Sequence, residues 1–235
     1  MSYPVVILTE GTADDICINK IIEENGLGKD KFHIPKFDQG KFGGITNFHL
    51  KISSIRSTIE PYTLSESRAM VIVADNDNNP KAQFEKVCGQ IMLANKNRSP
   101  AESFGVPQKP REAARQSLTL PPLYVLMLPW DGEEGCLETL CLYSANKTRY
   151  KTELDCVERF SDCVGSKNWI DAKKLPDVSR KAKFHVKSIL TSICEDPYTP
   201  FHCSWNPEKS PMDIFQLKNA AFSNVIGFLA QFTAA

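Results

Sequence analysis

The sequence predicts an α/β protein with a mainly parallel sheet, helices on both faces of that sheet, and a C-terminal helical extension. Strand-like and helix-like segments alternate through residues 1–145. The segment 69–74 is apolar at every position, which is typical of a strand buried on both faces in a parallel sheet. From residue 146 onward the apolar residues follow helical spacing. We therefore expect an α/β core at 1–145 and a helical extension at 146–235 packed on it.

The core alternates in the order βαβαβαβα. The predicted strands cover residues 5–9, 32–37, 69–74 and 123–128, and the predicted helices cover residues 13–24, 45–59, 80–95 and 135–143. The second strand belongs at an edge of the sheet, because Pro35 has no backbone N–H to donate to a neighbour. Residues 97–122 contain five prolines and are expected to form a long polar loop.

Three apolar stripes at helical spacing predict the helices of the extension. They comprise Leu154, Val157, Phe160 and Val164; then Ala182, Val186, Ile189, Leu190 and Ile193; and finally the segment from Phe215 to Phe232.

The composition excludes several classes of protein. Lys plus Arg equals Asp plus Glu at 28 each, so any nucleic-acid surface must be a local patch. No stretch of ~18 apolar residues predicts a membrane span, and the N-terminus lacks the basic start of a signal peptide. The eight cysteines form no C-x-x-C pair, which argues against zinc. We interpret them as buried free thiols of a cytoplasmic protein.

Acidic residues follow three of the predicted strands. The first strand ends at Glu10, the third runs into Asp75 and Asp77, and the fourth leads to Glu138 one turn into the next helix. Asp14 lies four residues after Glu10, on the first turn of a helix. Because ligands of parallel α/β proteins bind beyond the carboxyl ends of the strands, we expect these five acids to share one cleft.

The five acids predict a site for Mg²⁺ or Mn²⁺. Residues two apart in an extended chain project to the same side, so Asp75 and Asp77 are expected to converge. Hard divalent cations take oxygen ligands, and clustered carboxylates repel one another unless a cation neutralises them. Taken alone, the segment 75–79 fits a capping turn as well as a metal site. An EF-hand is excluded because Pro80 occupies the position that requires Gly.

These motifs resemble the Toprim domain of topoisomerases, primases and OLD-type nucleases. The chain is most similar to a small stand-alone Toprim-like family of uncharacterised prokaryotic proteins related to those nucleases. The stretches that carry the resemblance are LTEGTADD (8–15), FGG (42–44), VIVADNDNN (71–79), LPWDGEEGCLETLCL (128–142) and KAKFHVKSIL (181–190). In this chain the Asp-x-Asp is followed by Asn-Asn-Pro, where the family has a glycine-bearing turn.

The resemblance implies specific roles for these residues. Glu10, Asp75 and Asp77 become the principal metal-binding and catalytic acids. The other two acids take the places of a further acid of OLD-type nucleases and of the acid after a later strand. Those nucleases also use a downstream lysine, whose counterpart here is Lys181 or Lys183.

A basic segment offers a surface for a phosphate backbone. Residues 167–187 contain seven basic and two acidic side chains, a local net charge of +5. The basic residues are Lys167, Lys173, Lys174, Arg180, Lys181, Lys183 and Lys187, and the acids are Asp171 and Asp177. A solvated helix face explains such a run equally well. Lys109, Arg111 and Arg115 of the long loop would extend this surface, and Trp130 would stack a base.

The sequence thus favours a Mg²⁺- or Mn²⁺-dependent nuclease acting on DNA or RNA in a prokaryotic defence or toxin-like system. One alternative is a non-catalytic module that binds metal or nucleotide and acts with a partner ATPase. Another is a nucleotide-sugar transferase, which does not explain Glu10 and Gly11. Self-association into a homo-oligomer stays open, and no membrane partner is expected.

Overall fold

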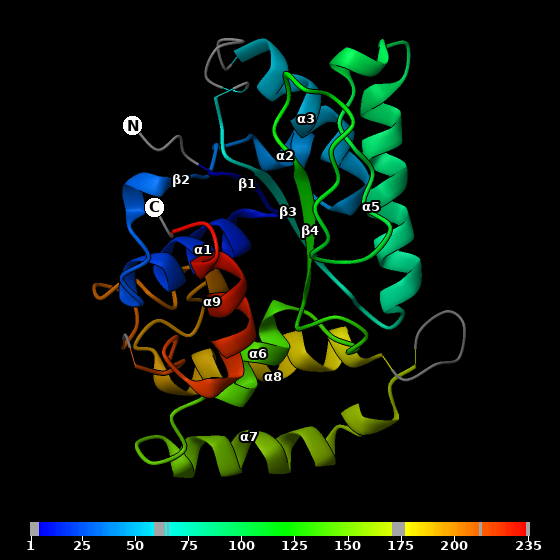
Figure 1. Cartoon of the computed structure of the whole chain (residues 1–235). Helices are drawn as coiled ribbons and strands as arrows, with labels where there is room; N and C mark the ends of the chain where they lie inside the picture. The colour runs from blue at the N-terminus through cyan, green and yellow to red at the C-terminus, as the bar shows by residue number, and fades with distance from the viewer. Residues whose placement is uncertain (1–4, 59–63, 65, 171–176, 212, 234–235) are drawn as a thin grey trace.

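A computed structural model describes residues 5–58, 64, 66–170, 177–211 and 213–233 of the chain (Figure 1). Within these residues, four strands form one sheet in the order β2-β1-β3-β4, and every pairing is parallel. The strands are β1 (Val5–Leu8), β2 (Phe32–His33), β3 (Met70–Asp75) and β4 (Leu123–Leu128). The predicted α/β class with a parallel sheet is confirmed.

Helices cover both faces of the sheet because alternate strand residues point to opposite sides. On one face lie α1 (Thr12–Glu24), α6 (Leu137–Ser144), α8 (Val178–Ile193) and α9 (Ser223–Ala230), and on the other lie α3 (Phe48–Thr58) and α5 (Pro80–Asn95) (Figure 1). In β3, Val71 and Val73 pack toward the first group of helices, whereas Met70 and Ile72 pack toward the second.

Further helical elements complete the described chain. They are α2 (Gln39–Phe42) and α7 (Lys151–Cys163), with 3₁₀ turns at Lys29–Lys31, Ile45–Asn47, Pro100–Glu102, Ser166–Asn168, Phe201–Cys203 and Ala220–Phe222. The α7 helix lies outermost, against α8 (Figure 1). In the described part of the chain, every helix is too short or too polar to cross a bilayer.

The helical extension shares its core with the sheet. Val186 and Leu190 of α8 and Phe228 of α9 belong to the same buried cluster as Val5 and Ile7 of β1. The last predicted stripe becomes helical only from Ala220, where the side chain of Asn219 accepts a hydrogen bond from the Ala221 N–H and begins the turn. The segment before it makes an isolated bridge between Ala145 and Phe215 instead.

The second strand and the long loop at 97–122 differ in detail from the sequence prediction. The second strand is only two residues long and ends before Pro35, which cannot donate to the ladder. The long loop at 97–122 is irregular, as expected, but it runs along β4. Ala114 exchanges two backbone hydrogen bonds of 2.9 Å with Leu123, and the Arg111 N–H donates to the Val125 carbonyl at 2.7 Å.

A substitution that shortens a buried side chain of α8 tests whether the helical extension and the sheet unfold as one unit. Leu190 is fully buried, so Leu190→Ala is expected to lower the free energy of unfolding by about 2–5 kcal/mol. Urea unfolding followed by circular dichroism and by tryptophan fluorescence should give one coincident transition. The control Leu118→Ala removes the same atoms from a side chain that is 92% exposed and should change stability by less than about 0.5 kcal/mol. Two separate transitions would contradict a shared core.

Candidate metal centre

Four of the five predicted acids meet at the carboxyl edge of the sheet. Glu10 follows β1 and Asp75 ends β3, whereas Asp14 and Glu138 lie in the first turns of α1 and α6. All four side chains are partly buried, and their charges act on one another. The parallel sheet therefore gathers side chains that are distant in sequence, as the positions of the strand ends predict.

Backbone N–H groups hold these carboxylates in place. The Asp75 N–H donates to Glu10 Oε1 at 2.8 Å, and the Leu137 N–H donates to Asp75 Oδ1 at 3.0 Å. The Gly11 N–H donates to Asp14 Oδ2 at 2.9 Å. Among the described residues, the second oxygen of each of these three carboxylates has no hydrogen-bond partner. Each acid is thus oriented through one oxygen and keeps the other for a ligand.

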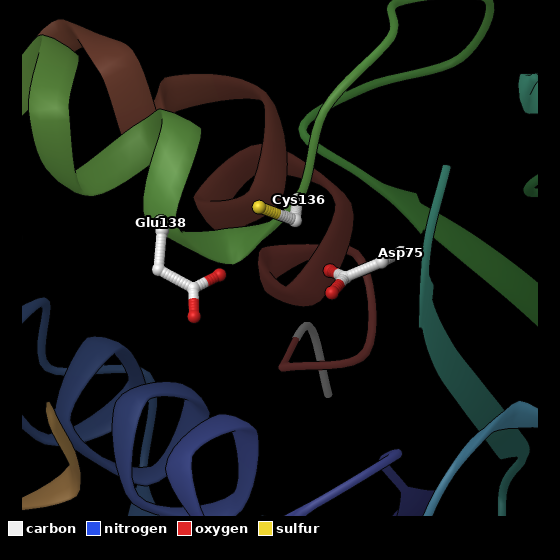
Figure 2. Close-up of side chains that lie close together, drawn as sticks. All are labelled: Asp75, Cys136 and Glu138. Atoms are coloured by element: carbon white, nitrogen blue, oxygen red, sulfur yellow. The ribbon is translucent and has the colours of Figure 1, made fainter. Parts of the chain in front are cut away.

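A thiol joins the acids, which the sequence analysis did not anticipate. Ligand atoms of Asp75, Cys136 and Glu138 all lie within 4.8 Å of one another, and Figure 2 shows the three side chains around one common space. Cys136 is buried and is the residue immediately before α6. The sequence feature that could have placed Cys136 in the cluster is its position two residues before Glu138, at a predicted helix start.

Burial raises the pKa values of three of these carboxyl groups, those of Glu10, Asp14 and Asp75. It is the largest cause for Asp14, whose pKa rises to about 7 with further contributions from the charges of Glu10 and Glu138. Burial also raises the pKa of Asp75 well above its ordinary range, helped by the charges of Asp14 and Glu10. The pKa of Glu10 is raised by burial and by Asp77, against the hydrogen bond from Asp75. The protein alone therefore supplies too little positive charge to balance the carboxylates at this site.

Lys183 is the lysine that faces the acids. Desolvation lowers the pKa of its amine, but the charges of Glu138 and Asp75 outweigh this effect and hold the pKa above its ordinary value. Lys183 also lines a pocket beside Asp77, and Lys181 does not line this pocket. Residues two apart on a helix lie roughly 200° apart around its axis, so only one of the two predicted lysines can face the cleft.

Asp77 does not continue the extended segment of Asp75, so the premise for their convergence is wrong, but its charge still acts on Glu10 and Lys183. The extended chain ends at Asp75, and Asp77 adopts a positive φ of 48°. Its Oδ2 accepts a hydrogen bond of 2.7 Å from Gln83 Nε2, and its carbonyl accepts one of 2.7 Å from the Gly135 N–H. Asp77 therefore lies between the acidic cluster and the pocket at the start of α5.

The asparagines around these acids position three other elements. The buried Asn76 donates through Nδ2 to the carbonyls of Trp130 and Glu133, each at 2.7 Å, and so holds the connection between β4 and α6. Asn78 Oδ1 accepts from the Val178 N–H at the start of α8 at 2.9 Å. Asn79 caps α5 by accepting from Ala82 N at 3.0 Å.

Lys51 is a second residue that sequence reasoning missed. Its buried amine donates to the carbonyl of Thr9 and, at 3.2 Å, to that of Glu10, so it fixes the backbone from which Glu10 projects. Burial lowers the pKa of this amine, whereas Asp15, Asp14 and Glu10 raise it. The signal was a lysine in line with the buried Phe48 and Ile52 on the apolar face of α3.

Several residues of the predicted nucleic-acid surface have other roles or are not described. The Arg111 guanidinium lies 4.3 Å from the centre of the Trp130 ring and pairs with Asp131, so it covers one face of the ring that was predicted to stack a base. Lys173, Lys174 and Asp171 lie outside the described residues, as does the side chain of Lys167.

Fold and site together define a parallel α/β protein with a buried carboxylate cluster at the carboxyl edge of its sheet. More particularly, the model of a family described as "Protein of unknown function (DUF3226)" matches residues 4–233, and the chain belongs to this family. No curated protein and no solved structure matches the chain.

The donor set fits a divalent cation. Buried carboxylates with raised pKa values mark a place where a cation would relieve repulsion between like charges. Their oxygens suit Mg²⁺ or Mn²⁺, whereas the sulfur of Cys136 suits a softer ion. Asp75 and Glu138, whose ligand atoms lie within 4.8 Å of each other, are the carboxylates placed to hold it, and the charges of Glu10 and Asp14 act on the same site.

The raised pKa of Asp14 is expected to make the cation-free protein less stable as pH rises towards about 7. The pKa of Asp14 is about 7 in the folded state, against 3.8 ordinarily, so the folded state holds more protons between these two values. The contribution of Asp14 to stability is thus greatest below about 3.8 and is lost as pH rises through about 7. Thermal midpoints in EDTA measure this dependence, and Asp14→Asn should flatten it while keeping the acceptor for the Gly11 N–H. The exposed Asp30→Asn should retain the slope of the wild type, and an unchanged slope in Asp14→Asn would contradict the assignment.

The thiol should leave a spectroscopic signature with Co²⁺. If Cys136 is a ligand, the Co²⁺ protein will show a thiolate charge-transfer band in the near ultraviolet, which Cys136→Ser removes. The same substitution should weaken the binding of Zn²⁺ or Co²⁺ by about tenfold or more, with little effect on the binding of Mg²⁺. Cys163→Ser, at an exposed thiol, is the matched control. Persistence of the band in Cys136→Ser would exclude the sulfur as a ligand.

Proposed function

We propose that this protein is a Mg²⁺- or Mn²⁺-dependent nuclease that hydrolyses phosphodiester bonds in DNA or RNA. The observation that carries this proposal is the buried cluster of Glu10, Asp14, Asp75 and Glu138 with Lys183 beside it. The resemblance of the same residues to the Toprim domain supports it. A role in prokaryotic defence or in a toxin-like system belongs to the same proposal.

The acids would hold the cation, which when bound would supply an activated water and polarise a phosphoryl oxygen. Glu10 and Asp75 are already oriented by backbone N–H groups, so little ordering remains when substrate arrives. The ammonium of Lys183 is held in its charged form by Glu138 and Asp75. It would stabilise negative charge that develops on the phosphate oxygens.

We also propose a cytoplasmic location. All eight cysteines are free thiols, and six of them are buried. Buried free thiols are typical of proteins kept in a reducing compartment.

A second candidate is a metal-binding module that acts with a partner ATPase. Met92 and Leu93 on α5 are 57% and 51% exposed, and two adjacent large apolar side chains favour a protein contact on that helix. In that case the purified protein would bind the cation but would cleave nothing until a partner is added.

A cleavage assay on supercoiled plasmid, single-stranded DNA and RNA tests the nuclease proposal. With Mn²⁺ or Mg²⁺, Asp75→Asn and Lys183→Gln should each reduce the cleavage rate by about 100-fold or more. Asp75→Asn should also raise the thermal midpoint in EDTA, because it removes a carboxyl group whose ionisation is opposed by burial and by the charges of Asp14 and Glu10. Asp30→Asn and Lys209→Gln, at exposed sites, should cleave like the wild type. Wild-type cleavage rates in Asp75→Asn would refute the proposed chemistry.

A further inference from the structure

A pocket of about 610 Å³ opens beside the acidic cluster. Three segments line it: the loop that contains Asp77, the first turns of α5 and the start of α8. Asp77 and Lys183 belong both to this pocket and to the electrostatic surroundings of the acids. The pocket therefore adjoins the place where the proposed chemistry occurs.

Two helices begin at this pocket. The α5 and α8 helices have 16 residues each and start next to one another (Figure 1). The hydrogen bond from the Val178 N–H to Asn78 Oδ1 ties the start of α8 to the loop just before α5. The N-terminal ends of both helices carry partial positive charge, which favours an anion.

The charged side chains in the pocket are mainly basic. Lys86, Arg180 and Lys183 line it, and none of the three forms a salt bridge with another described residue. Two acids also line it, and both carboxylates already accept hydrogen bonds. Asp177 accepts from the Arg180 N–H at 3.0 Å, and Asp77 accepts from Gln83. The Arg180 guanidinium rests on the Trp169 ring at 4.4 Å, which holds it near the pocket.

Two buried polar atoms at the pocket have no partner in the described part of the chain. They are the hydroxyl of Ser179, a residue only 6% exposed, and Oε1 of Gln83. An unpaired buried hydroxyl is costly, and a phosphate oxygen would accept its hydrogen bond. The free carbonyl of Gln83 needs a donor, which the sugar hydroxyl or base N–H of a nucleotide supplies.

We propose that this pocket binds a phosphate of a nucleic acid strand, adjacent to the phosphate that lies at the acids. Arg180 and Lys183 contribute charge, Ser179 donates a hydrogen bond, and Asp77 separates the two positions. The inference rests on the proposed function, because it takes a nucleic acid strand as the substrate. Binding of the strand can nevertheless be measured without cleavage.

Fluorescence anisotropy with labelled single-stranded DNA and RNA oligonucleotides, in Ca²⁺ and over a series of KCl concentrations, tests this pocket. Arg180→Gln should weaken binding by about tenfold and lower the salt slope by about one. The matched control is Arg98→Gln, which removes the same group from an exposed residue just beyond the other end of α5 and should bind like the wild type.

Ser179→Ala separates a binding role from a structural one. It should weaken binding several-fold without lowering the thermal midpoint, because the hydroxyl has no partner among the residues that the structure describes. Equal effects of Arg180→Gln and Arg98→Gln, or failure of the wild type to bind either oligonucleotide, would overturn the inference. Binding that depends on Arg180 but is never followed by cleavage in Mn²⁺ would support the pocket and count against the nuclease.

Discussion

Burial of several carboxylates at one edge of the sheet is the constraint on which the rest of this site depends. Neighbouring strands bring Glu10 and Asp75 together, and the amide of Asp75 donates to the carboxylate of Glu10. These side chains are partly buried, so each charge needs a nearby donor or cation. The surrounding elements supply such groups: the Leu137 N–H at the start of α6 and the amine of Lys183 on α8. The helical extension thus completes a site that the sheet begins.

The loop after β3 organises this arrangement through its neutral side chains. Asn76 binds the connection to α6, Asn78 binds the start of α8, and Asn79 begins α5. One short loop therefore sets the relative positions of three helices as well as two acids. Loss of an asparagine here would displace whole elements, whereas loss of an acid would change mainly the charge.

Sequence reasoning located the acids well and their supporting residues poorly. Glu10, Asp14, Asp75 and Glu138 follow strands or begin helices, and parallel topology places such positions together whatever the details. The direction of Asp77 depends on a single left-handed backbone angle, which an Asp-Asn-Asp pattern does not reveal. Cys136 was interpreted only as one of the buried thiols and Lys51 was assigned no role, because their roles depend on tertiary contacts. Helix geometry allowed only one of Lys181 and Lys183 to face the cleft, but the rotation of α8 decided which.

The segment that runs along β4 has a consequence for self-association. Backbone groups of Arg111 and Ala114 already occupy positions on that strand where an incoming strand would pair. At the opposite edge, β2 presents only two residues before Pro35 interrupts hydrogen bonding. Neither border of the described sheet offers a long open ladder, so a second copy could not continue the sheet by strand addition without displacing a resident segment. Among the described residues, the surfaces that remain for a contact between copies are therefore those of helices and loops.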